Sequence, residues 1–237
     1  EEREDGVEIR QVLRQERKFR LDAQQRMSLE GRFRQVLKGD VNNGRDGYMV
    51  RSLYFDTLAD RDFFEKMGGV ETRRKMRLRI YSPDADVAYL EMKQKQGANQ
   101  AKRSLQISRG DAELLMKGVY HPLLAYQEDF AAECYGVLTM HLYRPKVLVE
   151  YLRRAYVLQE NSTRITFDGP IYASPFCGSL FQKSPGLSPI MNPSETVLEV
   201  KYNHFLPGYV KNMLAVCDRS ETSVSKYALA RQCKTIF

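Results

Sequence analysis

Two arginines, Arg77 and Arg79, lie two positions apart in the segment ETRRKMRLRIY (71–81), among strand-forming residues. Side chains alternate between the two faces of a β-strand, so both guanidinium groups are expected on one face, together with Arg73 and Lys75. Like charges on one face repel each other, unless the face meets bulk water or a strongly anionic ligand. Guanidinium groups bind phosphate oxygens in a bidentate manner, so this spacing suits a phosphate-binding site.

Four further segments repeat this pattern, namely YLEMKQK (89–95), VEYLRRAY (149–156), TRITFD (163–168) and LEVKY (198–202). For any one strand, the simpler interpretation is a half-exposed sheet whose charged face is solvated. Five such strands rich in arginine favour instead a shared face that binds a polyanion. An inward carboxylate, above all Glu199, would then suit a divalent metal that bridges phosphate oxygens. The strongest candidates on this face are Arg77, Arg79, Lys93, Lys95, Arg153, Arg164, Glu199 and Lys201.

The composition is that of a globular protein with anionic partners. The chain has 237 residues, 43% hydrophobic and 28% charged, with a formal net charge of +7. That charge favours nucleic acid, phosphorylated small molecules or an acidic membrane surface as partners. Four widely spaced cysteines form no C-x-x-C pair, so we expect reduced thiols in a cytoplasmic protein. No apolar run approaches the roughly 18 residues of a membrane span, so no transmembrane segment is expected.

The pattern of elements predicts an α+β fold made of one domain, 1–237. A helix is expected from Asp22 to about residue 38, because Asp22 is a good N-cap. Strands are expected at the end of 7–21 and at 48–57, 71–81, 87–95, 101–108, 146–158, 163–172 and 196–203. Helical patterns occupy 58–67, 110–141, 208–217 and 222–234. Most connections between strands are too short for parallel crossovers, so an antiparallel sheet, closed or nearly closed and with helices outside, is predicted.

A family resemblance follows from nine segments in order: RQERKF (14–19), RSLYFDT (51–57), RRKMRLRIY (73–81), LEMKQK (90–95), KRS (102–104), YLRRAY (151–156), RITFD (164–168), LEVKYN (198–203) and SKYALA (225–230). From about residue 8 to 231 the chain resembles the VTC domain, the polyphosphate polymerase module of the vacuolar transporter chaperone complex. That domain is one of the triphosphate tunnel metalloenzymes, which are related to the CYTH proteins. The resemblance implies an antiparallel β-barrel tunnel of about eight strands, with helices packed outside.

The resemblance also implies roles for individual residues. The metal-binding residue would be Glu199, with Mn²⁺ or Mg²⁺ as cofactor. Many tunnel enzymes begin with E-x-E-x-K, whereas this chain has R-x-E-x-K, with Arg14 in the first glutamate position. This departure favours the polymerase-like branch and leaves open whether Glu16 reaches the metal. The expected catalytic residues are Lys18, Arg77, Arg79, Lys93, Arg153, Arg164 and Lys226, and the expected substrate-binding residues are Lys95, Lys102, Lys201 and Ser225.

The implied function is that of a polyphosphate polymerase-like phosphotransferase, which moves the terminal phosphate of ATP onto a growing polyphosphate chain. Its partners would be ATP or another triphosphate, and inorganic polyphosphate or pyrophosphate. Two alternatives stay open: a hydrolase of triphosphates with the same fold, and a non-catalytic module that binds polyphosphate or nucleotides. Nucleic acid is not expected, because the strands lack an aromatic ladder for stacking bases. His121, His141 and His204 are scattered and form no catalytic constellation.

Overall fold

A single antiparallel sheet runs through the described chain. The computed structural model describes residues 14–97, 99–176 and 178–233, of which 14 and 218–220 are described by their backbone alone. Across the sheet the long strands follow the order β1-β10-β8-β7-β3-β4-β5-β6, and the short β2 and β9 pair with β7 and β8. The bounds are β1 (Arg14–Leu21), β2 (Lys38–Gly39), β3 (Tyr48–Asp56), β4 (Arg73–Ile80), β5 (Val87–Gln96), β6 (Asn99–Ser108), β7 (Arg144–Leu158), β8 (Thr163–Pro175), β9 (Ser188–Pro189) and β10 (Thr196–Asn203).

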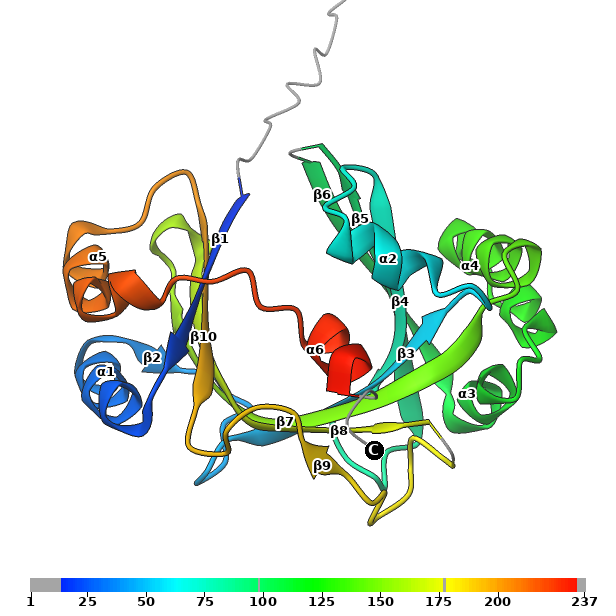
Figure 1. Ribbon diagram of the computed structural model, residues 1–237, viewed down its shortest axis with the longest axis horizontal. Coiled ribbons are helices and arrows are strands. Elements are labelled where there is room, and N and C mark those ends of the chain that lie inside the picture. Colours follow the sequence, from blue (N-terminus) through cyan, green and yellow to red (C-terminus); the bar gives the residue numbers. More distant parts are fainter. Residues whose placement is uncertain (1–13, 98, 177, 234–237) are drawn as a thin grey trace, which may run out of the picture.

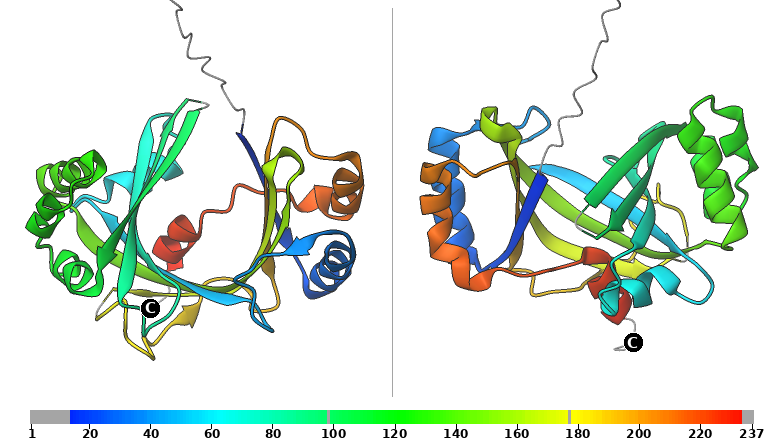
Figure 2. Two further views of the ribbon diagram at one scale, coloured as in Figure 1. Left: turned by 180° about the vertical axis from the view of Figure 1, so that it is seen from behind. Right: turned by 90° about the horizontal axis from the view of Figure 1, so that it is seen from above.

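The sheet curves into a U, with β1 and β6 at the tips of its two arms (Figure 1). Helices α1 (Ala23–Val36) and α5 (Gly208–Leu214) lie outside one arm, and α3 (Arg109–Met116) and α4 (Asp129–Met140) lie outside the other. Helix α6 (Lys226–Gln232) lies inside the U, as Figure 2 also shows, and contacts α2 (Arg61–Met67). The 3₁₀ helices are η1 (His121–Ala125), η2 (Glu160–Ser162) and η3 (Ala215–Ser220).

Alternation along the strands gives the sheet an apolar convex face. One buried cluster on it joins β3, β4 and β5 to α3 and α4, and includes Met76, Leu90 and Leu115. A second joins β1, β8 and β10 to α1 and α5, and includes Phe19 and Phe33. Each such side chain contributes about 1.5–3 kcal/mol when it is fully buried. These two clusters therefore leave the opposite, concave face of the same strands free for polar side chains.

Two expectations about the architecture are corrected by the structure. The antiparallel sheet is present, but it is not a closed barrel: among the described strands β1 pairs with β10 alone and β6 with β5 alone, so β1 and β6 do not meet. The helices are also not all outside. Helix α6 packs on the concave face because Tyr227 stacks on Tyr54, with ring centroids 5.1 Å apart, and both lie in a third buried cluster with Tyr151 and Ile171.

The local predictions agree closely with the structure. The strand predicted at 196–203 is β10 with the same bounds. Asp22 caps α1, accepting a hydrogen bond from the backbone N–H of Gln25 at 2.8 Å. Residues 7–13 of the first predicted segment lie outside the described residues, and so does Cys177. Among the described residues, no disulfide joins Cys134, Cys217 and Cys233. Within the described ranges, no helix combines the length and hydrophobicity that a membrane crossing requires.

Gly47 fixes the start of β3 beside Arg153, so its replacement should weaken the fold. Its φ is +103°, and a Cβ there would lie 2.4 Å from the carbonyl oxygen of Arg153. We expect Gly47→Ala to reduce the free energy of unfolding by about 2–4 kcal/mol, because it combines backbone strain with a steric clash. The measurement is denaturant unfolding.

Gly31→Ala is the matched control, because Gly31 is an exposed residue of α1 and has nothing within 4 Å of the added Cβ. It should raise the free energy of unfolding by about 0.5–1 kcal/mol. Equal effects of the two substitutions would contradict the role given to Gly47.

Candidate functional site

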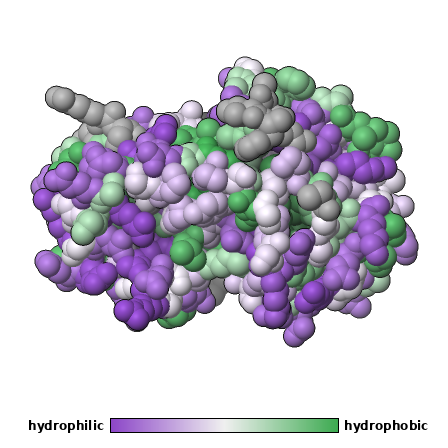
Figure 3. Space-filling view, turned by 60° about the horizontal axis from the view of Figure 1, so that its bottom comes forward, coloured by the Kyte–Doolittle hydropathy of each residue, from purple (hydrophilic) through white to green (hydrophobic). Residues whose placement is uncertain are grey.

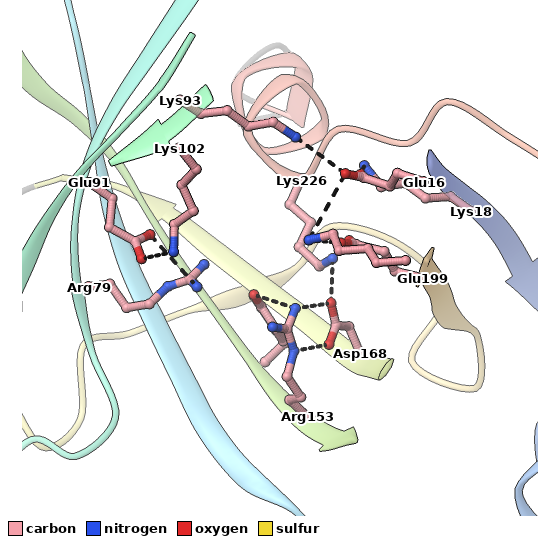
Figure 4. Close-up of polar contacts among 12 residues, drawn as sticks. Glu16, Lys18, Arg79, Glu91, Lys93, Lys102, Arg153, Asp168, Glu199 and Lys226 are labelled. Carbon is pink, nitrogen blue, oxygen red and sulfur yellow. Dashed lines mark hydrogen bonds and ion pairs between the residues drawn. The ribbon is translucent and has the colours of Figure 1, made fainter. Parts of the chain in front are cut away.

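The concave face of the sheet collects most of the basic side chains that the sequence singled out. The register places Lys18 opposite Glu199, Lys75 opposite Lys93, and Arg77 opposite both Tyr54 and Glu91. Residues opposite each other in a register lie on the same face, so the predicted parity is correct. Solvent reaches this face, since the side chains of Lys93 and Lys102 are 43% and 50% exposed. Three groups of ion pairs occupy it (Figure 4).

The first group surrounds Glu91 of β5. Arg77 lies 2.6 Å from its Oε2 and also donates a hydrogen bond to the Tyr54 hydroxyl at 3.1 Å. Arg79 lies 3.8 Å from the same oxygen and donates to Ser52, and Lys102 pairs with Oε1. Burial would raise the pKa of Glu91, but the surrounding cations lower it to about 2. One ionised carboxylate therefore orients three cations.

The second group surrounds Asp168 of β8, which is fully buried. Arg153 of β7 binds it with two hydrogen bonds, Nε to Oδ1 at 2.6 Å and Nη2 to Oδ2 at 2.8 Å. Lys226 of α6 lies 2.7 Å from Oδ2, above the Tyr151 ring. Burial alone would raise the pKa of Asp168, but the charges of Arg153 and Lys226 keep it below its usual value. Helix α6 thus delivers a lysine to the floor of the U.

The third group lies on β1 and β10. Lys18 is 2.5 Å from Oε1 of Glu16, and Lys201 pairs with Glu199. In the register Glu16 faces Lys201 and Lys18 faces Glu199, so like charges lie on the diagonals. Burial opposes ionisation of Glu199, but Lys201, Lys18 and Lys226 hold its pKa well below the usual range. Both carboxylates are therefore ionised at neutral pH.

Lys93 connects the two arms of the U. It lies on β5, and its ammonium group is 3.4 Å from Oε2 of Glu16 on β1. Figure 4 shows this contact reaching across from one wall to the other. The arms of the open sheet are therefore linked through side chains instead of through backbone pairing.

Three predicted residues have other or more peripheral contacts. Arg164 lies 2.6 Å from Oδ2 of Asp40 and donates a hydrogen bond to the Tyr48 hydroxyl. Lys95 faces Arg73 across β4 and β5, beyond the three groups. The Ser225 hydroxyl caps α6, accepting a hydrogen bond from the Ala228 N–H. The functional roles assigned to all these residues stay predictions.

Comparison with known proteins identifies the family. The model of the VTC domain matches residues 13–234 of this chain. The chain belongs to the VTC domain family. No curated protein matches this VTC domain at a significant level.

Two solved structures share its fold. One is a proposed adenylate cyclase from Bacillus halodurans, 12% identical, with a TM-score of 0.51 over 90% of this chain and 95% of that one. The other is a proposed adenylyl cyclase from Hippeastrum, described as having a dominant triphosphatase activity, 13% identical, with a TM-score of 0.51 over 92% and 96%. Both similarities extend over nearly the whole of each chain, so the U-shaped sheet of this VTC domain is a shared architecture.

The VTC domain has a donor set that fits a divalent metal bound together with phosphate. Among its described residues, no group of three or more histidine, cysteine, aspartate or glutamate side chains could hold a metal. Glu16 and Glu199 are two ionised carboxylates on one face of neighbouring strands. Mg²⁺ is commonly bound by one or two carboxylates plus substrate phosphates, and Mn²⁺ accepts the same oxygen donors. The fit therefore requires phosphate oxygens to complete the coordination.

Three residues of this face had no role predicted from the sequence: Glu91, Asp168 and Lys75. Glu91 and Asp168 are the anionic centres of two of the groups, and Lys75 donates a hydrogen bond to Ser225. All three could have been found from the alternation of faces, since each lies an even number of residues from a predicted cation on its own strand and so shares its face. The importance of Glu91 and Asp168 could not be predicted, because their ion pairs with neighbouring strands depend on the register.

Proposed function

We propose that this VTC domain is a polyphosphate polymerase, which transfers the terminal phosphoryl group of ATP to the end of a polyphosphate chain. One observation carries the proposal: cations outnumber carboxylates on the concave face. Two of the three groups have an excess of cations, and the third, with two of each, is joined by Lys93. Glu91 pairs with Arg77, Arg79 and Lys102, and Asp168 pairs with Arg153 and Lys226. Because every carboxylate is already neutralised, the remaining positive charge is available to a polyanion.

The length of the basic surface supports a chain-like ligand. On β4 alone, Arg73, Lys75, Arg77 and Arg79 share the concave parity. At about 3.3 Å per residue these positions span roughly 20 Å of strand. The surface continues over β5, β8 and β10, where Lys93, Arg164 and Lys201 lie. An extended polyanion can follow the whole length of this surface.

The proposed chemistry relies on positioning and charge. Arg77, Arg79 and Lys102 would hold phosphate oxygens of the nucleotide, and Arg153 with Lys226 would bind the phosphoryl group in transfer. The nucleophile, a terminal phosphate oxygen of the acceptor chain, is already ionised at neutral pH, so no side chain has to remove a proton. Glu199 and Glu16 would hold Mg²⁺ or Mn²⁺, which supplies further charge neutralisation to the phosphate oxygens. Phosphoryl transfer commonly depends on these two effects.

An assay of products tests this function against its alternatives. Purified protein is incubated with ATP and Mn²⁺, and ADP, free phosphate and long-chain polyphosphate are measured separately. We expect polyphosphate chains with a matching amount of ADP. Free phosphate without chains would overturn the polymerase and leave a triphosphate hydrolase. Neither product, with ATP still raising the melting temperature, would leave a binding module.

A further inference from the structure

Lys75 differs from the other central lysines of the concave face in having no carboxylate partner. Lys18, Lys93, Lys102, Lys201 and Lys226 each lie within 4.0 Å of a glutamate or aspartate oxygen. Among the described ion pairs none includes Lys75. Its ammonium group instead donates a hydrogen bond to the Ser225 hydroxyl at 2.8 Å and lies 5.9 Å from the centre of the Tyr227 ring. A half-buried cation with only neutral partners is poorly stabilised.

The charged groups that act most strongly on Lys75 are all positive. Its cross-strand neighbour on β5 is Lys93, its strand neighbour is Arg73, and Lys18 of β1 and Lys66 of α2 also act on it. At the start of α6, Lys75 contacts two neutral side chains, those of Ser225 and Tyr227. Burial first, and these cations second, lower the pKa of Lys75 to about 7. The amine is therefore divided between its neutral and charged forms at physiological pH.

We infer that Lys75 is a further phosphate-binding residue of the concave face, and that it takes up a proton when a polyanion binds. The inference rests on the proposed phosphate-binding function and deepens it. A phosphate oxygen beside Lys75 supplies the negative charge that no described carboxylate provides there, so the ammonium form becomes the stable one. The proton comes from solvent and adds to the amine nitrogen, and no covalent bond to phosphorus is made or broken. Lys75 thereby couples occupancy of the site to pH.

The direction of the pH effect follows from the depressed pKa. In the free protein Lys75 is mostly protonated at pH 6 and mostly neutral at pH 8. In the complex it is protonated at both values. On binding, Lys75 therefore takes up only a small fraction of a proton at pH 6 but nearly one proton at pH 8. The affinity for the polyanion consequently falls as the pH rises above about 7.

Calorimetry of inorganic tripolyphosphate binding tests this inference directly. Titrations without metal at pH 8, in two buffers of different ionisation enthalpy, give the number of protons taken up. Lys75→Arg keeps the charge but stays protonated, so we expect the wild type to take up about one proton more than this variant. Lys75→Met should bind about tenfold or more weakly and should also lack the extra proton. Lys66→Met removes one charge near Lys75 without removing the proposed contact, so it should weaken binding less than threefold.

The outcomes separate this inference from the proposed function. If the wild type binds tripolyphosphate but matches Lys75→Arg in proton uptake, or if Lys75→Met binds as tightly, Lys75 is no phosphate ligand and the proposed function stands. If the wild type binds no tripolyphosphate, both proposals fail together.

Thermal unfolding of the free protein gives a second test of Lys75. Between pH 7 and 10.5 the unfolded chain binds more protons at this lysine than the folded one, so the destabilisation is complete below pH 7 and fades towards pH 10.5. Lys75→Met should therefore raise the melting temperature more at pH 6 than at pH 9. An equal shift at both values would contradict an unfavourable buried charge.

Discussion

Glu199→Gln is expected to abolish metal-dependent turnover while leaving triphosphate binding intact. The amide keeps the size of the side chain but loses the charge that a divalent metal requires. Lys201 loses the nearer of its two carboxylate partners and Lys18 its cross-strand neighbour of opposite charge, so the concave face becomes more positive. Loss of a few kcal/mol of metal stabilisation corresponds to a fall in kcat of roughly 100-fold or more. The measurement combines turnover of ATP with Mn²⁺ and calorimetric binding of tripolyphosphate without metal.

Glu133→Gln is the matched control for this experiment. Glu133 belongs to α4 and pairs with Arg103 on the convex side of the sheet, so its replacement should change neither quantity. Glu16→Gln decides whether the second carboxylate takes part. If Glu16 binds the metal, its replacement should weaken the apparent affinity for Mn²⁺. Turnover that survives in Glu199→Gln would show that the metal, if one is used, is bound elsewhere.

The secondary structure and the two faces of the sheet were accessible from the sequence because both depend on local patterns. Leu78 and Ile80 alternate with Arg77 and Arg79, and the structure buries the first pair beneath the helices and turns the second inward. Asp22 specified its own helix start. Such features depend on neighbours within a few residues, which the sequence shows directly.

Local sequence patterns could not predict whether the sheet closes or where α6 lies. Whether β1 meets β6 depends on curvature accumulated over the strands between them, and no local pattern records it. Helix α6 lies inside because Tyr227 fills a space beside Tyr54, and its hydroxyl bonds Asp56 of β3. These contacts join positions about 170 residues apart in the chain.

The ionic partners of the site show a further limit of sequence reasoning. The inward cations predicted from the sequence suggested a face that only a polyanion could neutralise. The structure instead gives most of them a carboxylate, as with Arg77 and Glu91, which face each other across β4 and β5. A shift of the register by one residue would have placed Glu91 elsewhere. The carboxylates orient the cations, and the excess positive charge remains.

The outer surface of the molecule is also largely hydrophilic. Viewed with the bottom of Figure 1 brought forward, hydrophilic residues cover most of the surface, with smaller hydrophobic areas between them (Figure 3). Hydrophilic residues are therefore not confined to the concave face. Arg103, for example, pairs with Glu133 in the open, where an ion pair contributes only about 0–1 kcal/mol. The concave face is distinguished by its unequal pairing and partial burial, not by the mere presence of charge.

Arg77→Ala should weaken tripolyphosphate binding by roughly 100-fold with little loss of stability. A bidentate guanidinium contact with phosphate is among the stronger hydrogen-bonded interactions, and Arg77 is three-quarters buried, with its side chain 23% exposed, where screening is weak. Glu91 would keep Arg79 and Lys102 as partners, so no carboxylate is left unpaired. Relief of repulsion between Arg77 and Arg79 also offsets part of the lost contacts. We therefore expect the free energy of unfolding to change by less than about 1.5 kcal/mol.

Two measurements on the same protein preparations decide the role of Arg77. Denaturant unfolding gives stability, and calorimetry without metal gives the dissociation constant of tripolyphosphate. Arg103→Ala is the control, because it removes an arginine from the convex side that also has a glutamate partner. It should leave binding unchanged within about twofold at moderate salt, since its charge is screened. A strongly destabilised Arg77→Ala that still binds normally would make Arg77 a structural ion-pair partner. It would also remove the phosphate contact on which the proposed polymerase depends most.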